Sequence, residues 1–150
     1  MTNTAMSTPN EDAARREWLE SGRALLLPDI TCEAFDDYLN TLPWMASALD
    51  WSKMPPSVAF NVVKGTRDEL FAWATSTRIG RHTHLAVFYS RKNGGLVIPL
   101  ALALNNLDEL YQGWPGTRYC FSLDLVDGQL LPAYSDLLEW GKGDVWIAVA

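Results

Sequence analysis

The chain has few of the residues on which metalloproteins and covalent enzymes depend. Its 150 residues include only two cysteines and two histidines. Cys32 and Cys120 stand far apart, without the C-x-x-C spacing of a zinc or redox site, so we expect both to be free and buried. The sequence has no G-x-S-x-G nucleophile motif and no phosphate-binding loop. We therefore assign no catalytic residue and expect no metal and no cofactor.

Long apolar runs are also missing. The first residues, MTNTAMSTPNEDAARREW, hold no basic segment followed by an apolar one, which argues against a secretory signal. The longest apolar run, LVIPLALAL at 96–104, is about half the length that a membrane-spanning helix needs, and Pro99 interrupts it. We therefore expect a cytoplasmic protein without a transmembrane helix.

Charge is abundant but unevenly spread. The net charge is −6. Residues 1–63 hold 4 basic and 9 acidic side chains and residues 93–150 hold 2 and 7, whereas residues 64–92 hold 6 and 2. Acidic flanks repel nucleic acid and anionic membrane surfaces, and they speed association with a basic protein. We therefore expect a basic protein as partner, and neither nucleic acid nor membrane; the oligomeric state stays open.

The pattern of helix and strand signals predicts one α+β domain. We expect a disordered tail over 1–7 and a single globular domain over 8–150. Helices are predicted at about 9–21, which a capping box at Thr8 opens, at 31–42, 44–51 and 66–77, and in short turns after Asn106 and at 135–140. Strands are predicted at 57–63, 84–91, 96–100, 117–125, 129–134 and 144–150. About four helices and five or six strands joined by hairpins indicate a mainly antiparallel sheet.

Two sequence details predict how the sheet is built. Asn93-Gly94 lies between apolar runs and indicates a hairpin with a type I′ turn. TRYCFSLDL at 117–125 alternates between apolar and polar residues, which predicts a strand with one buried face and one solvated face.

Six of the seven tryptophans fall into two groups. Trp18, Trp73 and Trp146 lie on apolar stripes or in a strand that is apolar throughout, so we expect them in the core. Trp44, Trp51 and Trp114 stand beside prolines or acidic residues at the ends of elements, where partial exposure is expected. Large aromatic rings at such places are typical anchors of protein interfaces.

The two histidines stand two places apart in RHTHLAVFYSRKNGG, within the basic middle of the chain. On a strand, His82 and His84 point to one face, roughly 7 Å apart. A metal centre would need further ligands, and Asp124, Asp127, Asp136 and Glu139 miss the spacing of a calcium loop. The pair could instead serve as acid and base on a phosphodiester, with phosphate bound by Lys64, Arg67, Arg78, Arg81 or Arg91. A solvated basic strand end is the simpler interpretation.

The acidic residues of the second helix form another candidate site. Phe35, Tyr38, Leu39 and Leu42 form an apolar stripe, and Glu33, Asp36, Asp37 and Asn40 form the opposite one. Such charge runs often only keep a protein soluble. Carboxylates at this spacing can also imitate a phosphate backbone and block the basic cleft of a nuclease. We select Glu33, Asp36, Asp37 and Asp50 as a partner-binding face, with Trp44 and Trp51 as apolar anchors.

TCEAFDDYLN at 31–40, DWSKMPP at 50–56 and the small, acidic, tryptophan-rich chain as a whole resemble bacterial immunity proteins. These neutralise toxins that rival bacteria secrete or deliver by contact. The resemblance implies a protein that is not an enzyme and that binds a cognate basic toxin, such as a nuclease, by occluding its active-site cleft. Two alternatives remain open: a small phosphodiester-cleaving enzyme that uses His82 and His84, and an adaptor or assembly chaperone. The adaptor would add a partner strand along 96–104, although Pro99 removes one hydrogen-bond donor there.

Overall fold

The structure, a computed structural model, describes residues 9–106, 109–110, 117–141 and 145–150. Within them the strands are β1 Leu25–Leu26, β2 Trp44–Met45, β3 Ala48–Leu49, β4 Ser57–Asn61, β5 His84–Ser90, β6 Gly94–Pro99, β7 Arg118–Val126, β8 Gln129–Trp140 and β9 Val145–Val149. The α-helices are α1 Pro9–Glu20, α2 Asp29–Asn40, α3 Arg67–Ser76 and α4 Leu100–Asn105, and 3-10 turns η1 and η2 span Trp51–Lys53 and Arg78–Arg81. Seven strands form one antiparallel sheet in the order β1-β6-β5-β7-β8-β9-β4, and β2 pairs with β3. The predicted α+β class is confirmed.

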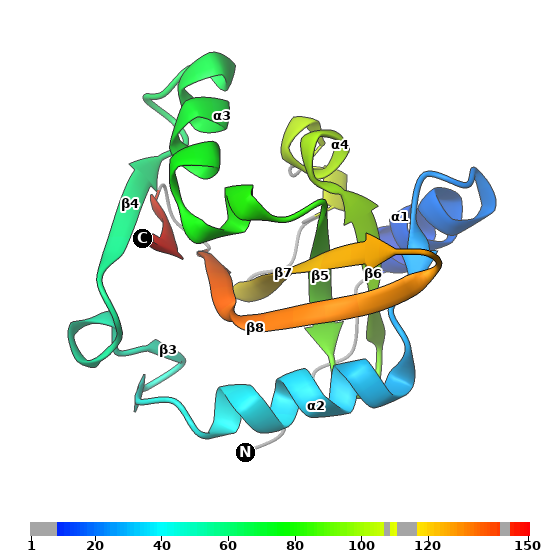
Figure 1. Ribbon diagram of the computed structural model, residues 1–150, viewed down its shortest axis with the longest axis horizontal. Helices are drawn as coiled ribbons and strands as arrows, with labels where there is room; N and C mark the ends of the chain where they lie inside the picture. The colour runs from blue at the N-terminus through cyan, green and yellow to red at the C-terminus, as the bar shows by residue number, and fades with distance from the viewer. Residues whose placement is uncertain (1–8, 107–108, 111–116, 142–144) are drawn as a thin grey trace.

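Helices cover the large sheet on both faces (Figure 1). On one face α2 contributes Phe35 and Leu39 to a cluster with Phe121 of β7. On the other face α1, α3 and α4 pack against the sheet, with Trp18 and Trp73 in the larger cluster. Trp18, Trp73 and Trp146 are all buried, as predicted, and so are both free cysteines.

This arrangement corrects the prediction for 117–125. Ser122, expected on a solvated face, is fully buried, and so is Cys120, for which the strand pattern predicted exposure although its residue type predicted burial; helices cover the second face of β7 as well. The alternation of apolar and polar residues is present, but Cys120 and Ser122 are small enough to pack, and Arg118 is also buried, where its guanidinium donates to the carbonyl of Tyr89. Tyr119 and Phe121 are buried on the α2 side, as expected.

Two segments predicted as helix are extended. At 44–51 the chain forms the β2–β3 hairpin, whose turn holds Ala46 at φ 48°. Leu49 is buried and its N–H donates to the hydroxyl of Tyr119, so a contact distant in sequence overrides the local helical pattern. At 135–140 the chain continues β8, because Leu138 and Trp140 pair with β7 on one side and β9 on the other.

The hairpin turns use glycine where the backbone needs a positive φ. At the β7–β8 turn both Asp127 (51°) and Gly128 (77°) have positive φ, as a type I′ turn requires. At the β5–β6 turn Gly94 has φ 76° but Asn93 does not share this conformation, so the predicted type I′ turn is wrong there. Ser90 pairs with Gly94 across a three-residue loop next to a β-bulge.

Several predictions fall outside the described residues: the tail over 1–7, the capping box at Thr8, Trp114, and most of the helix after Asn106. The capping box that opens α3 is present, with Thr66 and Glu69 bonded reciprocally. The α-helices among the described residues are too short or too polar to cross a bilayer.

Candidate functional site

The acidic face of α2 is only partly exposed. Cys32, Phe35 and Leu39 face the sheet, and Glu33 and Asp37 face solvent. Asp36, which we expected beside them, is buried at 6% exposure. It stands one helical turn after Cys32 and borders the apolar stripe, so the buried stripe is wider than its apolar residues suggest. The predicted row of three solvated carboxylates is therefore wrong at Asp36.

A cation from another element neutralises part of this face. Arg91, in the β5–β6 turn, places Nη1 2.8 Å from Oδ1 of Asp37 and 3.3 Å from Oδ2 of Asp36. The hydrogen bonds that Arg91 donates to Asp37 and to Asp36 raise its pKa, in that order of size. Arg91 was a candidate for phosphate binding, but here it pairs with the acidic helix. Among the three predicted α2 carboxylates, Glu33 has no ion pair with a described residue.

The β2–β3 hairpin presents apolar side chains at the end of α2. Trp44 is 40% exposed and Met45 57%. The indole Nε1 of Trp44 donates to the carbonyl of Leu39 in the last turn of α2, at 2.8 Å, and its ring meets the ring of Tyr119 edge-on at 5.5 Å. Trp44 is therefore held in place on one side and open to solvent on the other.

Asp50 and Trp51 lie mostly below the surface. Asp50, 9% exposed, caps η1 by accepting hydrogen bonds from the backbone N–H and the hydroxyl of Ser52. Its carboxylate is thus used within the fold. Trp51 is half-buried against the α2-side core, and its indole N–H is buried without a hydrogen-bond partner among the described residues.

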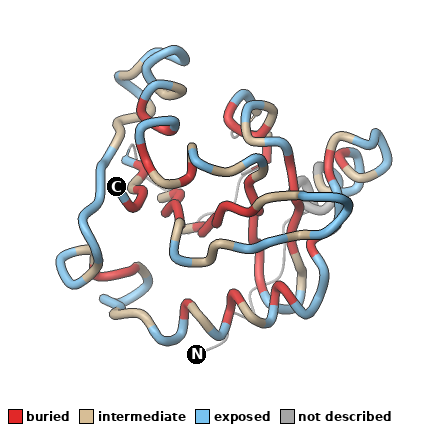
Figure 2. Tube along the Cα trace, viewed as in Figure 1, coloured by how far each residue is buried: buried red, intermediate tan, exposed pale blue. Residues whose placement is uncertain are grey.

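An aromatic layer supports the exposed residues from below. Phe35 lies 5.2 Å from Phe88, 4.4 Å from Phe121 and 6.0 Å from Tyr134, measured between ring centroids. Tyr38 of α2 stacks on Tyr134 of β8 at 6.2 Å. Burial raises the pKa of Tyr38 and of Tyr134. These contacts fix α2 on the sheet, so that Glu33, Asp37 and Trp44 stand on a rigid base. Figure 2 shows the alternation of buried and exposed positions along α2.

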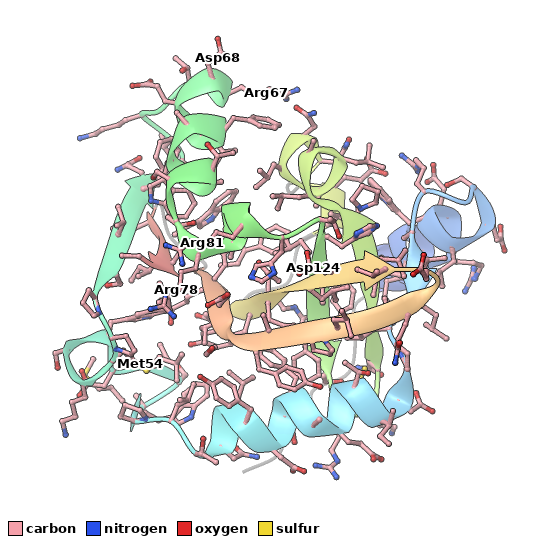
Figure 3. All side chains as sticks on the ribbon, viewed as in Figure 1. Met54, Arg67, Asp68, Arg78, Arg81 and Asp124 are labelled. Atoms are coloured by element: carbon pink, nitrogen blue, oxygen red, sulfur yellow. The ribbon has the colours of Figure 1, made fainter. Side chains whose placement is uncertain are left out.

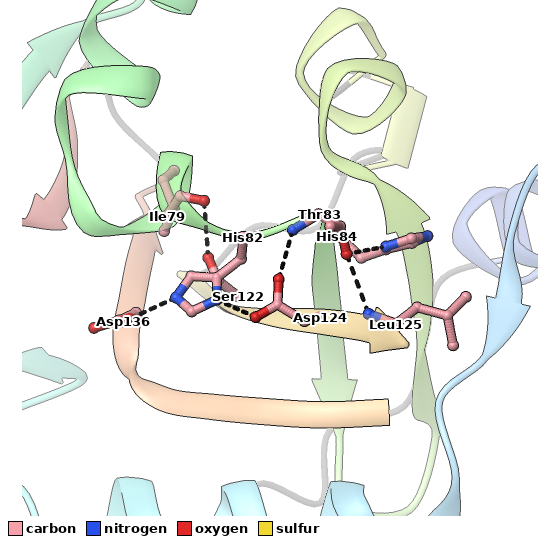
Figure 4. A network of polar contacts seen from close by, with 8 residues as sticks. All are labelled: Ile79, His82, Thr83, His84, Ser122, Asp124, Leu125 and Asp136. Carbon is pink, nitrogen blue, oxygen red and sulfur yellow. Dashed lines mark hydrogen bonds and ion pairs between the residues drawn. The ribbon is translucent and has the colours of Figure 1, made fainter. Parts of the chain in front are cut away.

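The histidines lie elsewhere and do not act as a pair. His82 follows η2, before β5 begins at His84. Its Nδ1 is 3.0 Å from Oδ2 of Asp124, and its Nε2 is 2.7 Å from Oδ2 of Asp136 (Figure 4). His84 instead contacts the hydroxyl of Thr83. The two imidazoles therefore serve different neighbours, contrary to the prediction of a shared face.

A bulge in β8 brings Asp136 to His82. Phe121 pairs with Leu137 but the next residue of β7, Ser122, pairs with Ala133, so 134–136 are extra residues in β8. Bulges often redirect a side chain in this way. Arg78 also approaches Asp136, at 3.5 Å, and donates through Nε to the carbonyl of Ala150. We call His82, Asp124, Asp136 and Arg78 the His82 cluster.

Both ring nitrogens of His82 are occupied by carboxylates. Burial of the ring lowers its pKa, but the hydrogen bonds to Asp136 and Asp124 outweigh this and raise the pKa above its ordinary value. The same bond from His82 lowers the pKa of Asp124. An imidazole held in this way has no free nitrogen for a substrate or a metal, and the described residues contain no group of three ligands that could hold a metal ion.

The remaining basic residues are dispersed. Figure 3 shows Arg78 and Arg81, which begin and end η2, while Arg67 lies at the far end of α3. A pocket of about 280 Å³ opens near Arg67, between β4, α3 and α4, with Phe60 and Trp146 in its wall. None of the polar side chains described there is buried without a partner. The basic residues that we considered as phosphate ligands therefore do not form one shared face.

Sequence reasoning did not identify the His82 cluster, although it named its members. Asp124 and Asp136 were considered only as calcium ligands, and Arg78 only as a phosphate ligand. The alternation of 117–125 does place Asp124 at the end of a strand. The bulge that moves Asp136 has no signature in the sequence, because its residues, Tyr134-Ser135-Asp136, read equally well as a turn.

No family model matches the chain, and no curated protein is similar enough in sequence to be counted as a relative.

Proposed function

We propose that the protein is a binding module that docks a basic partner protein, in the manner of a bacterial immunity protein that neutralises its cognate toxin in the cytoplasm. The docking surface is the α2–hairpin surface, which we define as Glu33, Asp37, Trp44 and Met45. The observation that supports it best is the 40% exposed indole of Trp44, fixed at the carboxyl end of an acidic helix.

This surface has the composition of a protein interface. Interfaces commonly combine an aromatic or methionine anchor with a polar rim, and few residues supply most of the binding energy. Trp44 and Met45 would be the anchors, and Glu33 and Asp37 the rim. A toxin with a basic cleft, such as a nuclease, would pair its lysines and arginines with the rim while the two apolar side chains exclude water. The toxin would then be inhibited by occlusion.

The burial of individual side chains decides which residues of the predicted partner-binding face could contact a partner. Asp36 and Asp50 are buried and already bonded within the chain, so we assign them to the support of the surface. Trp51 supports it as well, since it packs against the α2-side core. Glu33, Asp37 and Trp44 remain as contact residues.

The two alternative functions have less support. An enzyme that uses His82 and His84 would need a free ring nitrogen on His82, and both of its nitrogens contact carboxylates. An adaptor that adds a strand along 96–104 would need an open edge there. β6 instead lies between β1 and β5, and α4 begins directly after Pro99.

The test first searches the genes beside the one for this chain for a toxin, and uses its basic domain as the partner. Binding is measured by calorimetry and by surface plasmon resonance, and inhibition by residual nuclease activity. We expect Trp44→Ala to speed dissociation, and Glu33→Lys with Asp37→Lys to slow association and reduce its salt dependence. Affinity should fall at least about tenfold in each case.

A double variant with the same change in charge serves as control. Glu20→Lys with Asp68→Lys alters exposed residues of α1 and α3, on the other face of the sheet. It should keep most of the affinity. Equal losses in both double variants would mean that only net charge matters, and undiminished inhibition by Trp44→Ala would remove the proposed surface.

A further inference from the structure

The strand β4 forms an open edge of the large sheet. It pairs with β9 on one side and is the last strand in the order on the other. Figure 1 shows it at the left rim of the molecule, and Figure 2 shows its first half exposed. Val58 is 39% exposed, and Ser57 and Ala59 are exposed as well.

The hydrogen bonds around β4 show which backbone groups face outward. The carbonyl of Pro56 accepts from the N–H of Ala150, which places Pro56 and, two residues on, Val58 in bonded pairs with β9. The residues between them therefore turn their N–H and C=O away from β9. The carbonyl of Asn61 agrees with this, because it accepts from Gly65 outside the sheet.

Ser57 and Ala59 thus offer four backbone groups at this edge. Among the described residues, none forms a hydrogen bond with the N–H or C=O of Ser57 or of Ala59 outside the β4–β9 ladder. Proteins commonly protect such an edge with a charge, a proline, a bulge or a very short strand. SVAFN holds neither charge nor proline, and its register with β9 is continuous over five residues. The opposite edge, β1, is only two residues long.

We propose that a second copy of this chain occupies the β4 edge, with the two β4 strands antiparallel about a two-fold axis at Val58. In this register Ser57 faces Ala59 of the partner subunit, and the reverse pair forms by symmetry. All four outward groups of each copy are then bonded. The two seven-stranded sheets become one continuous sheet.

Charge and register favour a second copy over an arbitrary strand. A chain of net charge −6 repels its copy, but the edge itself is uncharged, so the contact brings no carboxylates together. Shifting the register by two residues either way would pair Ala59 with Pro55, which has no N–H, or would use Asn61, whose carbonyl is taken. The β4 edge is separate from α2, so this inference does not rest on the proposed function.

The contact is small, so we expect a weak, concentration-dependent dimer. Analytical ultracentrifugation of the full chain from about 10 µM to about 1 mM should show a monomer that converts to a dimer. Amide exchange followed by NMR should show protection of Ser57 and Ala59 that rises with concentration, while the amide of Val58 stays protected throughout.

Two kinds of variant test the register. Ala59→Pro removes an outward N–H and none of the bonds to β9, so it should abolish the dimer with little change in thermal unfolding. Val58→Lys and Val58→Glu each place like charges opposite one another on the axis, and each should be monomeric. Mixing these two variants should restore a dimer that contains one of each.

Three results would overturn the proposal. These are a monomer at about 1 mM, a dimer that persists in both Ala59→Pro and Val58→Lys, or a mixture of the lysine and glutamate variants that stays monomeric. A monomer whose binding to a toxin is weakened by Ala59→Pro would assign the edge to that partner and would equally exclude the second copy.

Discussion

The His82 cluster and the α2–hairpin surface use charge in different ways. In the cluster, one imidazole and one guanidinium balance two carboxylates, and three segments distant in sequence are joined. On the α2–hairpin surface Arg91 satisfies part of the acidic helix, whereas Glu33 and two apolar side chains face solvent. The histidine region, for which the sequence left a catalytic role open as an alternative, is therefore bonded internally, and the acidic helix that we selected as a partner-binding face retains groups that a partner could contact.

This difference predicts that variants near the surface separate stability from binding. The largest loss of stability should come from Phe35→Ala, because Phe35 is fully buried and contacts four other aromatic rings. We expect a loss of about 3–5 kcal/mol in the free energy of unfolding, measured with urea. Trp44→Ala, which removes a partly exposed ring, should cost less than half as much. Equal losses would mean that Trp44 is part of the core and is no separate anchor.

The next largest effect tests the cluster by contrasting its two histidines. His82→Ala removes both hydrogen bonds and leaves two carboxylates facing each other, so we expect a loss of about 1–3 kcal/mol. His84→Ala removes the contact with Thr83 and a minor electrostatic effect on Asp124, and it should cost no more than about 0.5 kcal/mol. Losses of similar size in both variants would contradict a specific role for His82.

The loss caused by His82→Ala should also depend on pH. The pKa of His82 is raised in the folded state, chiefly by the hydrogen bonds to Asp136 and Asp124, which overcome the opposing effect of burial. A raised pKa stabilises the fold fully below the unfolded value of about 6.5, and this contribution is lost as the pH rises through the higher folded value. The difference in unfolding free energy between the wild type and His82→Ala should therefore be largest near pH 6 and shrink toward pH 9. A difference that grows with pH would contradict the assignment.

The sequence predicted the elements whose signals are local. The Thr66 capping box, the apolar stripe of α2 and the hairpin at Asn93-Gly94 are set by neighbours within a few residues, and the structure contains them, although that hairpin turn is of another type than predicted. The helix predicted at 44–51 and the turn of helix at 135–140 are wrong because contacts with residues distant in sequence decide both segments: a hydrogen bond to Tyr119 in the first and strand pairing in the second. No local pattern shows that Leu49 meets Tyr119 or that Trp140 lies between β7 and β9.

The sequence predicted most of the exposed residues of the α2–hairpin surface but not the buried ones beside them. Glu33, Asp37 and Trp44 could be placed on an exposed surface from helical periodicity and from the prolines nearby. The burial of Asp36 and Asp50 could not, since each depends on a partner or cap that forms only in the folded chain. Arg91 pairs with residues of α2 that lie more than fifty positions away in the sequence. The charge count by segment therefore assigned Arg91 to the basic middle of the chain and its partners to the acidic first part, although the folded chain brings them into contact.

The smallest effect separates the two carboxylates that share Arg91. The side chain of Asp37 is 69% exposed and that of Asp36 only 8%. Exposed ion pairs add little to stability, because water screens them and both side chains lose freedom. Asp37→Asn should therefore leave the urea midpoint unchanged within error, whereas Asp36→Asn should lower it clearly. If Asp37 faces a basic partner, the same Asp37→Asn change should still slow association at low salt and have no effect at high salt, because long-range attraction is screened there. A lowered urea midpoint for Asp37→Asn would instead place this carboxylate with Asp36 as a support of the fold.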